Sequence, residues 1–247
     1  MKRFYFKRLL KCAILFMVCV IVGCEDGDGD GNRSGLFSVN ATCQVEFAPG
    51  NLAEDGRSFV AHQWENGGYF GWGTGRNPDT KSLNPFDYSR FNDWGDSIAG
   101  GWRTLSFEEC EYLLHDRPDA EDKTGLATVN NVHGLILLPD DWTLPIGFTF
   151  VAGKNGWDNN KYTMEQWWQM EKRGAVFLPA TGERRGKNVS NVGDVGGYWL
   201  STSYYGFKAC RMYFDEDCIL TWWDRDRYDG QSVRLVRNVG IKIGILK

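Results

Sequence analysis

Residues 197–236 read GYWLST-SYYGFKACRMYFDEDCILTWWDRDRYDGQ-SVRLV. The apolar, aromatic and β-branched residues at both ends predict short β-strands over 198–202 and 232–236. Between these two, residues 211–214 predict one strand of a hairpin. The stretch therefore indicates a fold built on small sheets, in which an aromatic and charged hairpin is held between two flanking strands.

The composition agrees with such a fold. Of 247 residues, 30 are Gly, 11 Trp, 10 Tyr and 15 Phe, and 42% are hydrophobic. Glycine costs about 1 kcal/mol at each helical position, which counts against a mainly helical bundle. The hydrophobic content is that of a folded chain. The net charge of −4 offers no attraction to nucleic acid, so we expect no nucleic-acid partner.

Two helix starts are marked by capping boxes, in which a hydroxyl residue precedes Glu or Gln by three positions. Ser106 and Glu109 open a helix through about residue 115, and Thr163 and Gln166 open a second one that ends at Gly174. The expected class is α+β, with two helices around small mixed or antiparallel sheets and long ordered loops. The remaining predicted strands or hairpins cover 37–47, 135–138 and 175–178.

The first two dozen residues have the pattern of a secretory signal. Residues 1–11 hold five cations and no acid, and the apolar run 12–22 is shorter than the roughly 20 residues of a bilayer span. The run ends at Gly23-Cys24, which resembles a bacterial lipobox. We predict a lipoprotein signal peptide over 1–23 and lipidation of Cys24, which would anchor the chain to a membrane without spanning it. A signal anchor with an incidental cysteine is the alternative.

Acid and glycine alternate directly after Cys24, so residues 24–36 are predicted to be a flexible tether. The spacing of Asp26, Asp28 and Asp30 also fits the start of a calcium loop, but the twelfth position is Phe37, where an EF-hand needs Glu. Acidic residues behind a lipidated cysteine resemble the surface-export signal of Bacteroides-group lipoproteins. That resemblance implies a cell-surface position on the outer membrane. Residues 37–247 contain no low-complexity break and are interpreted as one domain.

Four cysteines remain after the predicted lipidation site, and in an oxidising compartment they allow three disulfide pairings. The sequence does not choose among these pairings, although Cys210 and Cys218 could face each other across a hairpin. The four are Cys43, Cys110, Cys210 and Cys218.

Five short motifs occur in the order of a known family. They are GWRTLS at 101–106, LLPD at 137–140, FLPATG at 177–182, GYWLST at 197–202 and SVRLV at 232–236. Together they resemble the Fibrobacter-type major paralogous domain over roughly 94–237. The resemblance implies a C-type-lectin-like fold over 37–247, in the branch shared with formylglycine-generating enzymes. The family is common in Bacteroides-group surface lipoproteins.

Enzyme chemistry finds little support in the sequence. His62, His115 and His133 have no spacing typical of a zinc site, and neither a nucleophile elbow nor a phosphate-binding loop is present. The lectin-fold enzymes use a copper-binding cysteine pair, but Cys210 and Cys218 are spaced more widely and their flanks differ. The calcium-dependent sugar-binding motifs of lectins are not matched either. We therefore expect a non-enzyme without a metal or cofactor.

Two arginines and two tryptophans in these motifs are interpreted as structural. Arginine is seldom buried without a partner, so Arg103 and Arg234, each flanked by apolar residues, are predicted to form fixed ion pairs. Trp102 and Trp199 are predicted to belong to the core rather than to a ligand platform.

Residues 203–231 have the chemistry of a binding surface. Tyr and Trp offer large contact area at low entropy cost, and Arg adds forked donors. The resemblance implies that this stretch lies on one exposed face of the lectin-like fold. The predicted ligand-binding residues are Tyr204, Tyr205, Phe207, Arg211, Tyr213, Trp223, Arg225, Arg227 and Tyr228.

Two other interpretations of this stretch stay open. Its aromatics could be core, as we expect for Ala209, Met212, Phe214, Ile219 and Leu220. The stretch also resembles the variable region of proteins diversified by retroelements, in which Asn codons change to Tyr, Asp, Arg and similar residues. Trp222 and Trp223 do not fit that substitution.

Three functions follow from these observations. The first is a surface-anchored, non-catalytic binding module for an unknown protein or glycan ligand. The second is a structural subunit of a surface appendage or lipoprotein complex. The third, a formylglycine-generating or other enzyme, has the least support.

Overall fold

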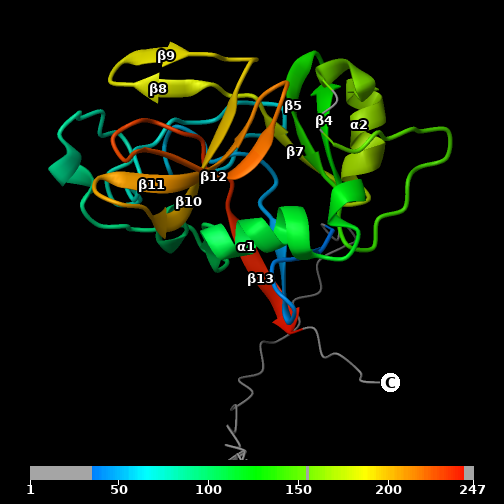
Figure 1. The fold of residues 1–247 in the computed structure, drawn as a ribbon, viewed down its shortest axis with the longest axis horizontal. Coiled ribbons are helices and arrows are strands. Elements are labelled where there is room, and N and C mark those ends of the chain that lie inside the picture. The colour runs from blue at the N-terminus through cyan, green and yellow to red at the C-terminus, as the bar shows by residue number, and fades with distance from the viewer. Residues whose placement is uncertain (1–34, 154–155, 242–247) are drawn as a thin grey trace, which may run out of the picture. The chain divides into compact units, whose positions relative to one another are not determined.

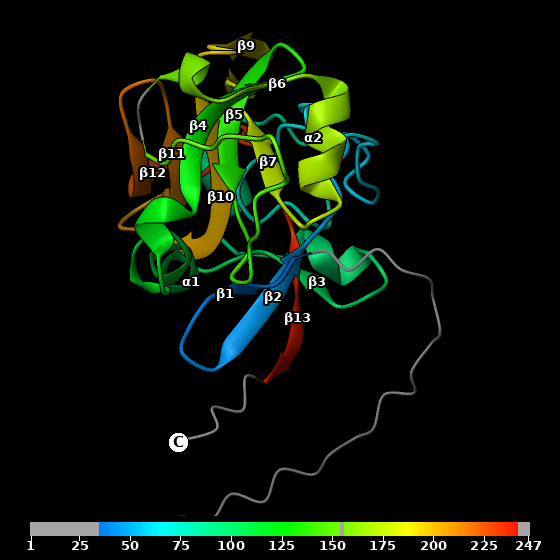
Figure 2. The ribbon, with the colours of Figure 1, turned by 90° about the vertical axis from the view of Figure 1, so that its right-hand side faces the viewer.

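Strands from both ends of the described chain meet in one sheet. The computed structural model describes residues 35–153 and 156–241, which belong to one compact unit. Antiparallel pairing gives the sheet order β1-β2-β13-β3, and β13 and β2 run side by side (Figures 1 and 2). The first two strands confirm the hairpin predicted over 37–47. Their bounds are β1 Phe37–Ser38, β2 Cys43–Phe47, β3 Trp102–Arg103 and β13 Val236–Ile241.

A second sheet carries one of the two helices. Its order is β6-β4-β5-β7, and α2 (Met164–Glu171) lies beside β7 (Figure 2). Trp167 and Met170 of the helix are buried in one apolar cluster with Phe177 of β7. Strands β5 and β7 confirm the predictions over 135–138 and 175–178, whereas β4 was not predicted. The bounds are β4 Thr124–Val129, β5 Val132–Leu137, β6 Lys161–Tyr162 and β7 Val176–Pro179.

The third sheet holds the stretch that begins at residue 197. It consists of β10 (Gly196–Ser203), β11 (Lys208–Phe214) and β12 (Ile219–Asp226), paired antiparallel in that order. Helix α1 (Phe107–Glu111), continued by a π-turn over Tyr112–Asp116, lies below these strands in Figure 1. A separate hairpin, β8 (Glu183–Arg185) and β9 (Asn188–Ser190), rises above them.

The described residues thus form an α+β structure with two α-helices and several small sheets, as predicted. Long loops connect these elements and carry short 3-10 turns, which the sequence did not indicate. The turns are η1 Pro85–Tyr88, η2 Trp94–Ser97, η4 Ala120–Asp122 and η5 Trp157–Asn159.

Both predicted capping boxes are confirmed. The Glu109 amide donates to the Ser106 hydroxyl at 3.2 Å, and the Glu109 carboxylate accepts from the Ser106 amide at 2.9 Å. Thr163 and Gln166 make the same reciprocal pair at 3.3 and 2.9 Å. Each cap satisfies amides that a helix start leaves unpaired, and such a cap typically contributes about 1 kcal/mol. Gly174, with φ of +89°, ends the turn after α2.

Arg103 forms the predicted structural ion pair, but Arg234 does not. The Arg103 guanidinium binds both carboxylate oxygens of Glu109, at 2.6 and 2.7 Å. Arg234 is 5% exposed and donates instead to the side-chain oxygens of Gln63 and Asn51, at 2.6 and 3.3 Å. The prediction of an ion pair was wrong because two buried amide side chains supply the acceptors. Trp199 is core, as predicted, and its indole donates to the Phe70 carbonyl at 2.6 Å.

The final predicted strand begins later than expected. A single bridge with Tyr198 joins Ser232 to β10, whereas the Val233 and Leu235 carbonyls accept from the Leu52 and Ala48 amides, both at 2.9 Å. The regular ladder starts at Val236. Val233 and Leu235 are fully buried in the cluster that also holds Trp199. The apolar residues in this segment therefore mark a core connection that leads into a strand.

Candidate functional site

Three exposed aromatic side chains of the 203–231 stretch lie at the turn between β10 and β11. Tyr204 is 53% exposed, Tyr205 90% and Phe207 39%. The Tyr204 amide donates to the Lys208 carbonyl at 2.8 Å, and Gly206 takes a φ of +65° that a side chain would disfavour. A tight, hydrogen-bonded turn therefore places these three rings outside the sheet.

A fourth ring joins them from a distant part of the chain. Phe86, on η1, is 69% exposed and meets Phe207 edge to face, with ring centroids 5.0 Å apart. The local reason for its position is that Asn84 caps the turn and Pro85 occupies its first position. We call Phe86, Tyr204, Tyr205 and Phe207 the aromatic tip. Phe86 was missed by the sequence analysis, because nothing local indicates that η1 lies against the hairpin.

Arg227 belongs to the support of the tip rather than to its exposed surface. It is 8% exposed, and its guanidinium lies 4.4 Å from the centre of the Trp72 ring. It donates to the Lys208 carbonyl at 3.0 Å and to the Tyr88 carbonyl at 3.4 Å. The prediction that Arg227 faces a ligand was wrong, because this side chain links the end of the hairpin to η1.

Arg211 is also buried, contrary to the prediction of an exposed position. Its side chain is 2% exposed and donates to Glu183 of β8 at 3.1 Å and to Gln231 at 2.6 Å. Burial, together with the neighbouring Arg225, lowers the pKa of Arg211 to about 10, against the opposing effect of Glu183. Arg225 is half-buried and pairs with the same Glu183, and with Asp229 at 3.4 Å. Two arginines therefore share one carboxylate under the β8–β9 hairpin.

The two remaining tyrosines of the predicted face are half-buried. The Tyr213 hydroxyl donates to Asp215 at 2.7 Å, and Arg211 lies over its ring at 4.9 Å. The Tyr228 hydroxyl donates to Asp226 at 2.6 Å and accepts from Arg185 at 2.9 Å. Both tyrosine side chains expose only part of their surface to solvent. The side chain of Trp223 and the predicted lipidation site Cys24 lie outside what the structure describes.

The structure thus separates the predicted ligand-binding residues into an exposed group and a group that is wholly or partly buried. It brings Tyr204, Tyr205 and Phe207 together and places the arginines in the network beneath. Trp222, which the sequence analysis did not select, is 66% exposed on β12. The ladder shifts register between Arg211 and Tyr213, and such a shift changes which residues of the partner strand face outward. The expected core residues Ala209, Met212 and Phe214 are buried, and Ile219 and Leu220 are partly buried.

The hairpin does not bring Cys210 and Cys218 face to face. Cys210 stands opposite Asp224 in the β11–β12 ladder, and Cys43, Cys110 and Cys210 are free thiols. Burial raises the pKa of Cys110, whose side chain lies in the same apolar core cluster as Cys210. A raised pKa disfavours the reactive thiolate, so Cys110 is not a candidate nucleophile.

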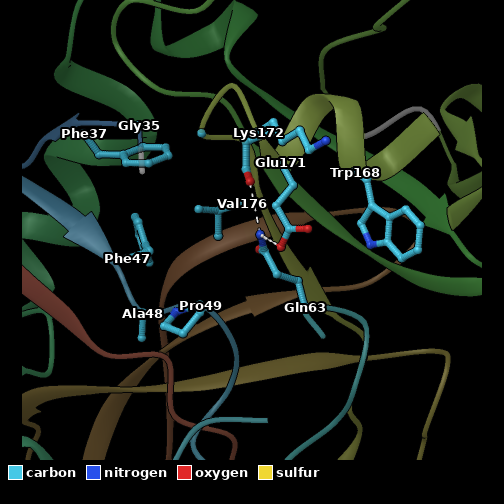
Figure 3. A pocket seen from close by; sticks show the side chains of 12 residues that line it. Gly35, Phe37, Phe47, Ala48, Pro49, Gln63, Trp168, Glu171, Lys172 and Val176 are labelled. Carbon is cyan, nitrogen blue, oxygen red and sulfur yellow. Dashed lines mark hydrogen bonds between the residues drawn. The ribbon is translucent and has the colours of Figure 1, made fainter. Parts of the chain in front are cut away.

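A small cavity opens beside α2, away from every predicted site residue. It measures about 220 Å³ and is lined on one side by Phe37 and Phe47 and on the other by Gln63 and Glu171 (Figure 3). The Gln63 amide donates to Glu171 at 2.7 Å, and its oxygen accepts from the Phe177 amide at 2.7 Å. Gln63 is therefore occupied by the protein's own groups.

Neither a metal cluster nor a membrane-spanning helix stands out in the described part of the chain. Across residues 35–153 and 156–241, no three His, Cys, Asp or Glu side chains gather in a way that could hold a metal ion. The helices of the same residues are too short and too polar to cross a bilayer. Comparison with family models, curated proteins and solved structures found no match to this chain.

Proposed function

We propose that this chain is a non-catalytic binding module that recognises a protein or glycan ligand through the aromatic tip. The observation that carries the proposal is the exposure of four aromatic rings on one hydrogen-bonded turn and the adjacent η1. Contiguous exposed apolar surface of this kind is costly in water and is typical of interaction sites. Tyr and Phe rings lose little conformational entropy on binding, which suits them as anchors.

The support beneath the tip favours binding over a flexible loop. The Tyr204–Lys208 hydrogen bond closes the turn, and Arg227 links this turn to η1 through two carbonyl groups. A surface that is ordered before binding loses less entropy when a ligand docks. The aromatic tip is therefore a preorganised contact surface.

The C-type-lectin-like fold is part of the proposal. Two capped helices, several small sheets and long loops agree with what the motif resemblance implies. The β11–β12 hairpin, which follows β10 in the chain and precedes residues 232–235, agrees as well. The turn that joins it to β10 reaches solvent. Lipidation of Cys24 and attachment to the outer surface of the outer membrane complete the proposal and rest on the sequence pattern alone.

The proposal is tested with the purified chain on a printed glycan array and an array of extracellular proteins. We expect binding to at least one immobilised ligand, and at least about tenfold weaker binding for each ring lost in Tyr204→Ser and Tyr205→Ser, since a buried aromatic ring contributes about 1.5–3 kcal/mol. The matched control removes two exposed apolar residues elsewhere, Ile146→Ser and Val192→Ser, and should bind normally. Binding that survives loss of both tyrosines would contradict the proposal, as would a chain that binds nothing on either array.

A further inference from the structure

Arg184 of β8 is a buried cation without an ionic partner. It is 4% exposed, and its guanidinium donates to the carbonyls of Gly186 at 2.6 Å and Tyr69 at 3.2 Å. Its Nε has no hydrogen-bond partner, and among the described residues no ion pair joins it to a carboxylate, although the charge of Asp229 acts on it. Burial lowers the pKa of Arg184, because removing a charge from water disfavours the charged form, and this effect outweighs the opposing effects of Tyr88 and Asp229. The backbone of Arg184 is fixed by two hydrogen bonds with Gly230, at 2.9 and 2.6 Å.

The other buried arginines are compensated or enclosed. Arg117 pairs with Asp140 at 3.3 Å, Arg211 pairs with Glu183 at 3.1 Å, and Arg227 lies over Trp72. Arg234 donates to two amide oxygens and faces a void of only about 20 Å³, which has room for little more than one water molecule. Arg184 differs from these four because it lines an open cavity.

That cavity lies between the β8–β9 hairpin and the loop that leads to η1. It measures about 430 Å³, which is within the range of small-molecule sites. Tyr69 and Phe70 contribute aromatic surface, and the exposed residues Lys81 and Lys187 line it together with Arg184. Two carboxylates, Glu54 and Asp79, also line it. Three cations and two anions leave an excess of one positive charge.

This balance selects among anionic ligands. A single carboxylate matches the one excess positive charge of the lining, and guanidinium groups such as that of Arg184 bind carboxylates through paired donors. A dianionic phosphate would meet repulsion from Glu54 and Asp79, whereas hydroxyl groups could donate to those two carboxylates. The aromatic walls suit the apolar face of a ring. We propose that the Arg184 cavity binds a small, ring-shaped carboxylate that carries hydroxyl groups, of the chemical class of acidic sugars.

The site is independent of the aromatic tip, because none of its lining residues belongs to the tip. A chain that lacks Tyr204 and Tyr205 should bind the acidic sugar as the unaltered chain does. Failure of one proposal would therefore leave the other intact.

The test is isothermal titration calorimetry of the full-length chain with D-glucuronate, D-glucose and D-glucose 6-phosphate. We expect glucuronate to bind more tightly than the neutral sugar and more tightly than the phosphate. Arg184→Gln should weaken glucuronate binding at least about tenfold, which corresponds to a hydrogen bond to a charged group. The matched control is Arg185→Gln, which removes the same charge from a side chain that is 62% exposed, and it should leave the affinity unchanged.

A second variant keeps the test valid if Arg184→Gln does not fold. Combined Lys81→Gln and Lys187→Gln alter only exposed rim positions and should weaken glucuronate binding about threefold, whereas Lys161→Gln with Lys172→Gln should have no effect. Absence of glucuronate binding overturns the proposal. So does glucose or the phosphate binding as tightly as glucuronate, or an equal loss in the Arg184 and Arg185 variants.

Discussion

The tip and the body of the β10–β12 sheet both come from the aromatic and arginine-rich 203–231 stretch, but their side chains lie in opposite environments. At the tip, Tyr205 is 90% exposed, whereas Arg211 in the body of the same sheet is 2% exposed. The difference arises from partners elsewhere in the chain. Glu183 on β8 and Gln231 accept from Arg211, while Phe207 of the turn at 204–207 packs its ring against Phe86. An aromatic and arginine-rich composition therefore does not by itself determine a binding face, because distant acceptors decide which side chains remain available.

The largest expected effect in this comparison comes from the body of the sheet. Glu183→Gln would leave Arg211 buried without a carboxylate and should lower the free energy of unfolding by about 3–5 kcal/mol. Guanidinium-induced unfolding measures this change. Lys208→Gln, which breaks a pair that is largely open to solvent, should cost less than about 1 kcal/mol. Similar costs for the two variants would remove the distinction between the buried network and the surface.

Arg227→Gln tests the link between the body and the tip, and its expected effect is smaller. The variant loses two charge-assisted hydrogen bonds and the contact with the Trp72 ring, which together should lower the free energy of unfolding by about 2–3 kcal/mol. Hydrogen exchange of the Tyr204 amide should accelerate, because this amide bonds to the residue that Arg227 holds. Unchanged exchange would show that the tip is ordered without Arg227.

The smallest effect is expected at the β11–β12 turn, opposite the tip. Burial by itself raises the pKa of Asp215, but hydrogen bonds from the Tyr213 hydroxyl, from Cys218 and from the Asp217 amide outweigh it, so the pKa lies below its usual value. A depressed carboxyl pKa stabilises the fold above the pKa of the unfolded chain, and this contribution is lost as the pH falls through the folded pKa. Acidification below about pH 4 should therefore weaken this turn.

Amide NMR resonances of residues 215–218, followed from pH 6 to pH 3, would show this weakening. The same titration of Asp215→Asn is the control and should show a smaller change, because the variant has no carboxyl group to protonate at this position. Equal acid sensitivity in the two chains would place the pH dependence in other groups.

The predictions that rest on neighbouring residues in the sequence were the most reliable. Each capping box needs only a hydroxyl and an acid or amide three residues apart, and both were found in the structure. Strands β5, β7, β10 and β11 were also predicted from their own residues. Strand β4 was not predicted, although the turn after it, Asn130-Asn131, has the positive φ values that asparagine tolerates in tight hairpins.

The candidate site was only partly predictable, for a related reason. Tyr204, Tyr205 and Phe207 surround a glycine turn, and that local arrangement puts them in solvent. The positions of Arg211 and Arg227 depend on Glu183, Trp72 and Tyr88, which lie far away in the sequence. The register shift near Tyr213 further changed which face the residues of β12 occupy, and no residue pattern indicated it.

By itself, the sequence determined the α+β class, the two helix starts and the exposure of Tyr204, Tyr205 and Phe207, because these follow from hydrogen bonds and backbone preferences within a few residues. Only the tertiary structure decided that Phe86 joins the turn at 204–207, that Arg227 supports this turn from within and that Arg184, among the described residues, lines a cavity without forming an ion pair. Those outcomes depend on which distant acceptors and rings come within a few ångströms of each side chain, and that information exists only once the chain has folded.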